Sequence, residues 1–90
     1  MDDLDRFLNE QLKDPEFKAE WERIQPEYEI MRSLIDVRIK LNLTQKELAE
    51  RSGVRQSNIS RVENGTVSPT VATLQALAAG MGKRLHISFE

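Results

Sequence analysis

The sequence predicts an all-α fold that ends in one short β-strand. Apolar residues recur at three- and four-residue spacing along most of the 90 residues, which is typical of helices that bury one face. Prolines, glycines and capping residues divide this pattern into short segments. Near the C-terminus the period changes to two, which indicates a strand.

Two helices and the start of a third are predicted in the N-terminal part. Residues 3–13 form an amphipathic segment, and Asp14-Pro15 is typical of an N-cap with proline at the first helical position. Pro26 is predicted to end the second helix and to open a third that runs to about Asn42. The apolar stripes of the first two helices are Leu4, Phe7, Leu8 and Leu12, and then Phe17, Trp21 and Ile24.

A compact pair of short helices follows. Thr44 and Glu47 match a capping box, and the helix that they begin is predicted to end near Gly53. The next helix covers residues 55–64 and ends at Asn64-Gly65. The side chains predicted to face the core from this pair are Leu48, Ala49, Val54, Ile59 and Val62.

A last helix and the strand complete the chain. Ser68-Pro69 is predicted to cap the helix, and Gly80 and Gly82 are predicted to close it. Its inward residues are Val71, Leu74, Leu77, Ala78 and Met81. A lone strand leaves its backbone groups unpaired, so the tail is predicted to pair with the same strand of a second copy. The dimerisation residues are Leu85, Ile87 and Phe89; a disordered tail is the alternative.

Residues 53–65, GVRQSNISRVENG, have an unusual composition for a helix. Their solvent side carries Arg55, Gln56, Ser57, Asn58, Ser60 and Arg61, several of which are middling or poor helix formers. Glutamate and lysine would make a solvent face at lower cost in helix propensity. The composition therefore favours a face that contacts something.

The order of helices identifies that contact through a resemblance. Helix, glycine-containing turn and helix follow one another over residues 44–64, as in a helix-turn-helix motif. The residues LNLTQKELAERSGVRQSNISRVENG and SPTVATLQALAAGMG resemble the helix-turn-helix domain of phage repressors and of related XRE-type bacterial regulators. The resemblance covers roughly residues 30–82. It implies a phage-repressor-like helix-turn-helix bundle, here with an N-terminal helical arm and the C-terminal strand.

The resemblance implies binding to double-stranded operator DNA. In this motif the second helix lies in the major groove, where glutamine, asparagine and arginine can pair with base edges. Gln45 matches the position that clamps a phosphate at the start of the preceding helix. The DNA-binding residues implied are Gln45, Arg55, Gln56, Ser57, Ser60, Arg61 and Asn64. A solvated polar residue is the alternative at each of these positions, above all at Ser60 and Asn64.

Two charged residues are assigned to architecture instead. By the same resemblance, Arg38 and Glu63 form a partly buried ion pair between the first and third helices of the domain. Removing one partner would leave an uncompensated charge.

The net charge of −2 conceals an asymmetry. Residues 1–30 hold ten acids and four bases, a net charge of −6, whereas residues 31–90 hold nine bases and five acids, a net charge of +4. The basic part suits nucleic acid and the acidic part suits a basic protein. Two solvated faces that merely differ in charge are the alternative.

The arm resembles a narrower family. The stretch DPEFKAEWERIQPEYEIMRSLIDVRIKLNLTQKELAE resembles HigA-type antitoxins of type II toxin–antitoxin systems, and KRLHISFE resembles the tail of small dimeric antitoxins. This resemblance implies a small basic ribonuclease toxin, RelE/HigB-like, as a partner. The toxin-binding candidates are Leu4, Phe7, Leu8, Leu12, Phe17 and Trp21, with acids Asp5, Glu10, Glu16, Glu20 and Glu22 at the rim. Packing of the stripe on the chain's own domain is the alternative.

Other functions find little support in the sequence. The single histidine, His86, has no catalytic partner in its pattern, and Gly80-Met81-Gly82 does not follow a strand as a phosphate-binding loop would. Without cysteine or a ligand cluster, no metal site and no cofactor are expected. No apolar run approaches the roughly 20 residues that span a bilayer, and the acidic N-terminus is no signal peptide, so a cytoplasmic protein is expected.

The sequence therefore predicts three parts: an arm over residues 1–26, a DNA-binding domain over 27–82 and a dimerisation strand over 83–90. The function predicted is a non-enzymatic antitoxin that neutralises its toxin and, as a homodimer, represses its own operon. Two alternatives stay open. One is a stand-alone XRE-family transcriptional regulator, and the other is a protein-interaction module that no longer binds DNA.

Overall fold

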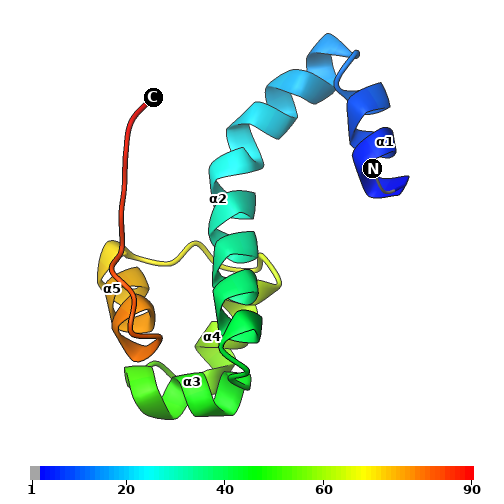
Figure 1. The fold of residues 1–90 in the computed structure, drawn as a ribbon. Coiled ribbons are helices and arrows are strands. Elements are labelled where there is room, and N and C mark those ends of the chain that lie inside the picture. The colour runs from blue at the N-terminus through cyan, green and yellow to red at the C-terminus, as the bar shows by residue number, and fades with distance from the viewer. Residues whose placement is uncertain (1–2) are drawn as a thin grey trace.

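The computed structural model describes residues 3–90, which form five helices and no strand. The helices are α1 (Asp3–Gln11), α2 (Pro15–Lys40), α3 (Gln45–Ser52), α4 (Gln56–Glu63) and α5 (Val71–Gly80). In Figure 1, α3, α4 and α5 gather around the C-terminal half of α2, while α1 and the first half of α2 extend away from them as an arm. The predicted all-helical class is confirmed.

The hydrophobic core lies where these four helices meet. Leu48 of α3, Ile59 of α4 and Leu77 of α5 are almost completely buried, and Leu34 of α2 is 5% exposed. Each of these side chains contributes about 1.5–3 kcal/mol when it leaves water. Leu43, Val62 and Met81 join the same cluster. The core therefore fixes α3 and α4 on the C-terminal half of α2.

The prediction that Pro26 ends a helix is wrong, because α2 runs through it without interruption. A proline inside a helix lacks the N–H that would reach the carbonyl four residues earlier, but its φ angle is compatible with the helix. Contacts across Pro26 hold the two halves together: the rings of Trp21 and Tyr28 lie 5.3 Å apart, and Gln25 Nε2 donates to Glu29 Oε1. Figure 1 shows α2 bending in its N-terminal half.

The caps of α2 and α3 are those predicted, whereas the cap of α5 is not. Asp14 accepts from the Glu16 N–H at 2.9 Å. Thr44 Oγ1 accepts from the Glu47 N–H at 3.0 Å, and the Glu47 carboxylate accepts from the Thr44 N–H at 3.1 Å. At α5 the N-cap is Thr70, whose hydroxyl accepts from the Thr73 N–H. The predicted Ser68-Pro69 cap is therefore wrong by two residues.

The capping box makes the stability of α3 depend on pH. The hydrogen bond from the Thr44 N–H lowers the pKa of Glu47 below its ordinary value, because it stabilises the charged carboxylate. Glu47 therefore has a lower pKa in the folded protein than in the unfolded chain. This difference stabilises the fold at pH values above the unfolded-state pKa, and the stabilisation is lost as the pH falls through the folded-state pKa. We expect Glu47→Gln to lower Tm at neutral pH, while the two proteins melt alike well below pH 4. Thermal unfolding followed by circular dichroism measures this, and a difference that persists in acid would contradict it.

The C-terminal tail differs from the prediction. Residues 83–90 follow α5 as an extended segment without strand hydrogen bonds, so the predicted strand is absent from the single chain. The reason is that residues 3–90 contain no other extended segment with which the tail could form a ladder. Ile87 is 59% exposed and Phe89 is completely exposed. Val71, predicted to face inward, is also 54% exposed.

Gly80 contributes to the packing of α5 on α3, in addition to its predicted role at the end of the helix. It lies in the last turn of α5, and a Cβ added there would be 2.8 Å from Ser52 Cβ and 3.0 Å from the Ser52 backbone. The helix ends at Gly80, as predicted, and Gly82 two residues later adopts a left-handed conformation with a φ of 67°. Gly80 therefore allows the backbones of α3 and α5 to approach closely.

Candidate nucleic-acid interface

The turn between α3 and α4 is built from local backbone contacts. Gly53 adopts a left-handed conformation with φ 77°, and its N–H donates to the Ala49 carbonyl at 3.0 Å. The Val54 N–H donates to Ser52 Oγ at 3.1 Å. Arg55 then takes the N-cap position in an extended conformation without a side-chain capping bond. The helix α4 begins at Gln56, immediately after the turn.

One side of α4 is fixed in the core and the other faces solvent. Ile59, Val62 and Glu63 are buried. Among the predicted DNA-binding residues in or next to α4, Ser60 is half-buried and the other five are exposed: Arg55, Gln56, Ser57, Arg61 and Asn64. Three of the exposed five, Arg55, Gln56 and Ser57, lie at or before the first turn of α4, where a helix-turn-helix motif meets base edges. The structure thus brings Arg55, Gln56 and Ser57 together at one end of the helix.

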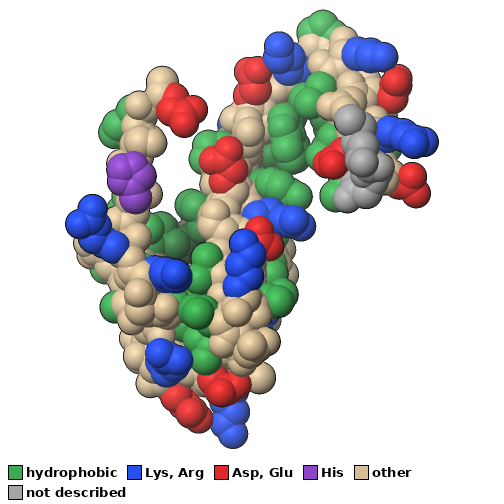
Figure 2. Space-filling model, in the orientation of Figure 1, with side chains coloured by type: hydrophobic (Ala, Val, Ile, Leu, Met, Phe, Trp, Pro, Cys, Tyr) green, Lys and Arg blue, Asp and Glu red, His purple; other side chains and the backbone are tan. Residues whose placement is uncertain are grey.

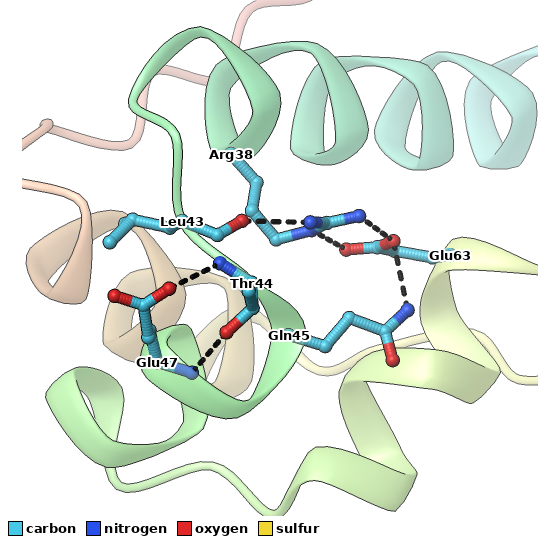
Figure 3. Close-up of polar contacts among 6 residues, drawn as sticks. All are labelled: Arg38, Leu43, Thr44, Gln45, Glu47 and Glu63. Atoms are coloured by element: carbon cyan, nitrogen blue, oxygen red, sulfur yellow. Dashed lines mark hydrogen bonds and ion pairs between the residues drawn. The ribbon is translucent and has the colours of Figure 1, made fainter.

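Arg38 and Glu63 lie together between α2 and α4, as predicted for the ion pair. Arg38 Nε donates to Glu63 Oε2 at 2.6 Å and Nη2 donates to Oε1 at 2.8 Å. Arg38 Nη1 also donates to the Leu43 carbonyl at 2.8 Å. The hydrogen bond to Glu63 raises the pKa of Arg38, against the opposing effect of burial. The two-point geometry therefore ties the end of α4 to α2 and to the start of α3 (Figure 3).

The side chain of Gln45, the first residue of α3, is hydrogen-bonded to a residue of α4. Its Nε2 donates to Glu63 Oε1 at 3.1 Å, and Figure 3 shows its side chain extending from α3 toward the carboxylate at the end of α4. Nothing in the sequence indicated this contact, because the two residues are 18 positions apart and neither pattern implies the other. The predicted phosphate clamp thus shares an acceptor with the ion pair.

Asn64 is engaged in the turn after α4. Its Oδ1 accepts from the Thr66 N–H at 3.0 Å and from the Thr66 hydroxyl. The residue also borders a small pocket of about 310 Å³ beside Tyr28 and Met31 of α2. Its side-chain oxygen therefore has a local structural partner, although the residue itself is exposed.

The apolar stripe of the arm is only partly covered. Neither α1 nor the part of α2 before Leu34 contains a fully buried residue. Leu4 is 52% exposed, Phe7 is 56% exposed and Ile24 is 47% exposed. The other members of the stripe, Leu8, Leu12, Phe17 and Trp21, are half-buried. Figure 2 shows hydrophobic side chains between α1 and α2, surrounded by charged ones.

A second apolar surface lies next to the C-terminal tail. A groove of about 840 Å³ runs between α2, α5 and the tail. Its apolar lining includes Ile30, Leu34, Leu74, Leu77, Leu85 and Ile87. Figure 2 shows this hollow between the tail and α2, with basic side chains on the tail side.

Two other kinds of site are not found in the described part of the chain. Residues 3–90 contain no group of three or more histidine, cysteine or acidic side chains placed to hold a metal ion. No helix among them is both long and apolar enough to cross a membrane.

The fold and the exposed end of α4 define a helix-turn-helix protein. A helix-turn-helix family model matches residues 34–87, and the chain belongs to this family. The predicted XRE-type helix-turn-helix domain is thereby confirmed.

Curated relatives narrow the resemblance further. The chain is 34% identical over 90 residues to Antitoxin HigA1 of Mycobacterium tuberculosis, an alignment that covers 99% of this chain and 60% of the relative. It is 41% identical over 58 residues to an uncharacterized HTH-type transcriptional regulator of Haemophilus influenzae, covering 64% of this chain and 59% of the relative. A regulator of Methanothermobacter thermautotrophicus is 43% identical over 58 residues, covering 63% of this chain and 83% of the relative. No solved structure gave a significant match.

The chain thus spans about 60% of the length of the HigA1 relatives. The predicted similarity to HigA-type antitoxins is confirmed as a similarity that extends over the arm, whereas the regulators match over about two thirds of the chain.

Proposed function

We propose that this protein is a non-enzymatic antitoxin. Its arm would neutralise a cognate RelE/HigB-like ribonuclease toxin, and its helix-turn-helix domain would bind operator DNA as a dimer to repress its own operon. The observation that carries the proposal is that one chain combines an exposed first turn of α4 with an acidic arm whose apolar stripe is partly exposed.

The DNA-binding part rests on the exposed end of α4. Gln56 and Arg61 are side chains that pair with adenine or guanine edges in the major groove, and both face solvent. The adjacent Arg55 supplies positive charge where phosphates would lie. Family membership supports the same geometry, in which the second helix of the motif enters the groove.

The toxin-binding part rests on the arm. Phe7 and Leu4 are more than half exposed on a short helix, and short helices are marginal unless they dock. The net charge of −6 over residues 1–30 would repel DNA and attract a basic protein. The antitoxin relative matches across this arm, which favours an antitoxin over a stand-alone regulator. The arm over residues 1–26, the domain over 27–82 and the tail over 83–90 would thus serve three contacts.

A second copy would complete the dimer at the tail. Leu85, Ile87 and Phe89 alternate along an extended segment next to the apolar groove, and two of them are more than half exposed. Backbone pairing of two tails about a two-fold axis would supply the partner that a lone strand lacks.

The stand-alone XRE-family regulator is the second candidate. It is favoured by the Haemophilus influenzae and Methanothermobacter thermautotrophicus relatives, which are named as transcriptional regulators. In that case the arm would serve self-association and no toxin would bind.

The role of the arm in toxin binding is tested with the small basic protein whose reading frame lies next to that of this chain. We expect Phe7→Asp to weaken binding of that protein by about 30-fold or more. The substitution removes an aromatic side chain from an apolar contact and places there a carboxylate, which is unfavourable to bury. Isothermal titration calorimetry measures the affinity.

The matched control is Ala19→Asp, which adds the same charge to an exposed position of the arm outside the stripe. It should bind within about twofold of the unchanged protein. Equal affinity for the partner after deletion of residues 1–25 would refute the assignment of the arm. Absence of any partner, with DNA binding intact, would favour the stand-alone regulator.

A further inference from the structure

Glu63 is bound by two side chains at once. Its Oε1 accepts from Arg38 Nη2 at 2.8 Å and from Gln45 Nε2 at 3.1 Å (Figure 3). Its Oε2 accepts from Arg38 Nε at 2.6 Å. The residue is 9% exposed, whereas Gln45 is half-buried at the first position of α3. A fixed carboxylate thus holds a more accessible amide.

The chemistry of the carboxylate fixes the orientation of that amide. An ionised carboxylate can only accept hydrogen bonds, so Gln45 must present its NH₂ group and not its oxygen to Glu63. One N–H of the NH₂ group is used in this contact, and the second remains available as a donor. A mobile glutamine side chain loses much rotamer freedom when it binds a ligand, and this loss of entropy weakens binding. Because Glu63 already restricts the Gln45 side chain, less entropy would be lost when Gln45 binds a phosphate.

The charge of Arg38 is necessary for this arrangement. An unpaired carboxylate beside a phosphate would repel it, but the guanidinium bonded to both carboxylate oxygens compensates the charge. The pair can therefore lie next to DNA without opposing its backbone.

We infer that Glu63, neutralised by Arg38, is a positioning residue for DNA binding, because it holds Gln45 so that the free N–H of its amide can donate to a backbone phosphate. The inference rests on the proposed DNA-binding function. It gives the ion pair a second role beside tying α4 to α2.

The two roles are separated by the double variant Arg38→Met/Glu63→Leu. This variant has the same net charge as the unchanged protein, so its long-range attraction to DNA is the same. Replacement of a buried ion pair by apolar residues of similar size is often tolerated by the fold. The variant nevertheless leaves Gln45 without its acceptor.

The experiment compares four proteins: the unchanged protein, Gln45→Ala, Arg38→Met/Glu63→Leu, and the triple variant. The probe is a fluorescent mixed-sequence DNA duplex at low salt, because a phosphate contact does not depend on sequence. Fluorescence anisotropy gives the dissociation constants, and circular dichroism shows whether each protein is folded.

We expect Gln45→Ala to weaken binding by about 10-fold, the effect of losing a hydrogen bond to a charged group. The double variant should weaken binding by about 5-fold, because it removes the ordering of the amide and leaves the amide itself in place. The triple variant should bind no more weakly than Gln45→Ala, since Glu63 has no amide to position once Gln45 is replaced. A folded double variant that binds like the unchanged protein would overturn the inference, and so would effects that multiply in the triple variant.

Nuclear magnetic resonance of the unchanged protein without DNA gives a test that needs no substitution. The side-chain NH₂ of Gln45 should be nearly as rigid as the backbone, with an order parameter of about 0.8, while that of exposed Gln75 falls below about 0.6. Equal mobility of the two amides would overturn the inference. DNA binding that depends on Gln56 but not on Gln45 would do so as well, and it would leave the proposed function intact.

Discussion

Replacing Glu63 by alanine is expected to lower the free energy of unfolding by about 3–5 kcal/mol, the cost of leaving a partly buried charge without its partner. Arg38 would lose two of its three hydrogen bonds while its side chain stayed 15% exposed. The loss is large for a domain whose total stability is about 5–15 kcal/mol. Urea unfolding followed by circular dichroism measures it.

The comparison for this prediction is again Arg38→Met/Glu63→Leu. Because no charge is left uncompensated, the double variant should lose less stability than Glu63→Ala or Arg38→Met alone. Equal or greater harm from the double variant would show that the pair does not act as a unit.

Gly80→Val is expected to destabilise the fold by about 3 kcal/mol through overpacking. The first added carbon would lie within 3.0 Å of the Ser52 backbone, which cannot move aside as the end of a flexible side chain can. Since α3 carries Leu48 in the core, separating α5 from α3 would disturb the whole bundle. Tm should fall by roughly 10–20 °C.

Ala79→Val is the matched control, because it introduces the same side chain one position earlier, at an exposed site of α5. Its cost should be limited to helix propensity, about 0.5 kcal/mol. If the two variants melted at the same temperature, the close approach of α5 and α3 would not limit the residue at Gly80.

Local patterns predicted the domain well where the decisive interactions are close in sequence. The Thr44 capping box, the Gly53 turn and the buried side of α4 depend on residues a few positions apart, and each occurs in the structure. The Arg38 pairing required the family resemblance, because it joins residues 25 positions apart.

The incorrect predictions have physical causes that the spacing of apolar residues along the sequence does not reveal. Pro26 was predicted to end a helix, whereas α2 continues through it and the rings of Trp21 and Tyr28 are in contact across it. Gly80 ends α5 as predicted, but periodicity does not show its close approach to Ser52. The tail has strand periodicity, but a strand also needs a partner, and residues 3–90 of one chain do not provide one.

The most direct test of DNA reading by α4 is the affinity of the Gln56→Ala/Arg61→Ala variant for the DNA that precedes its own reading frame. We expect roughly 100-fold weaker binding by fluorescence anisotropy, since two base-edge contacts would be lost at about 1–3 kcal/mol each. Gln75→Ala/Arg32→Ala removes the same residue types and charge from exposed sites on α5 and α2, and it should bind within about threefold of the unchanged protein. An unchanged affinity of the α4 variant, or an equal loss in the control, would contradict a recognition helix at α4.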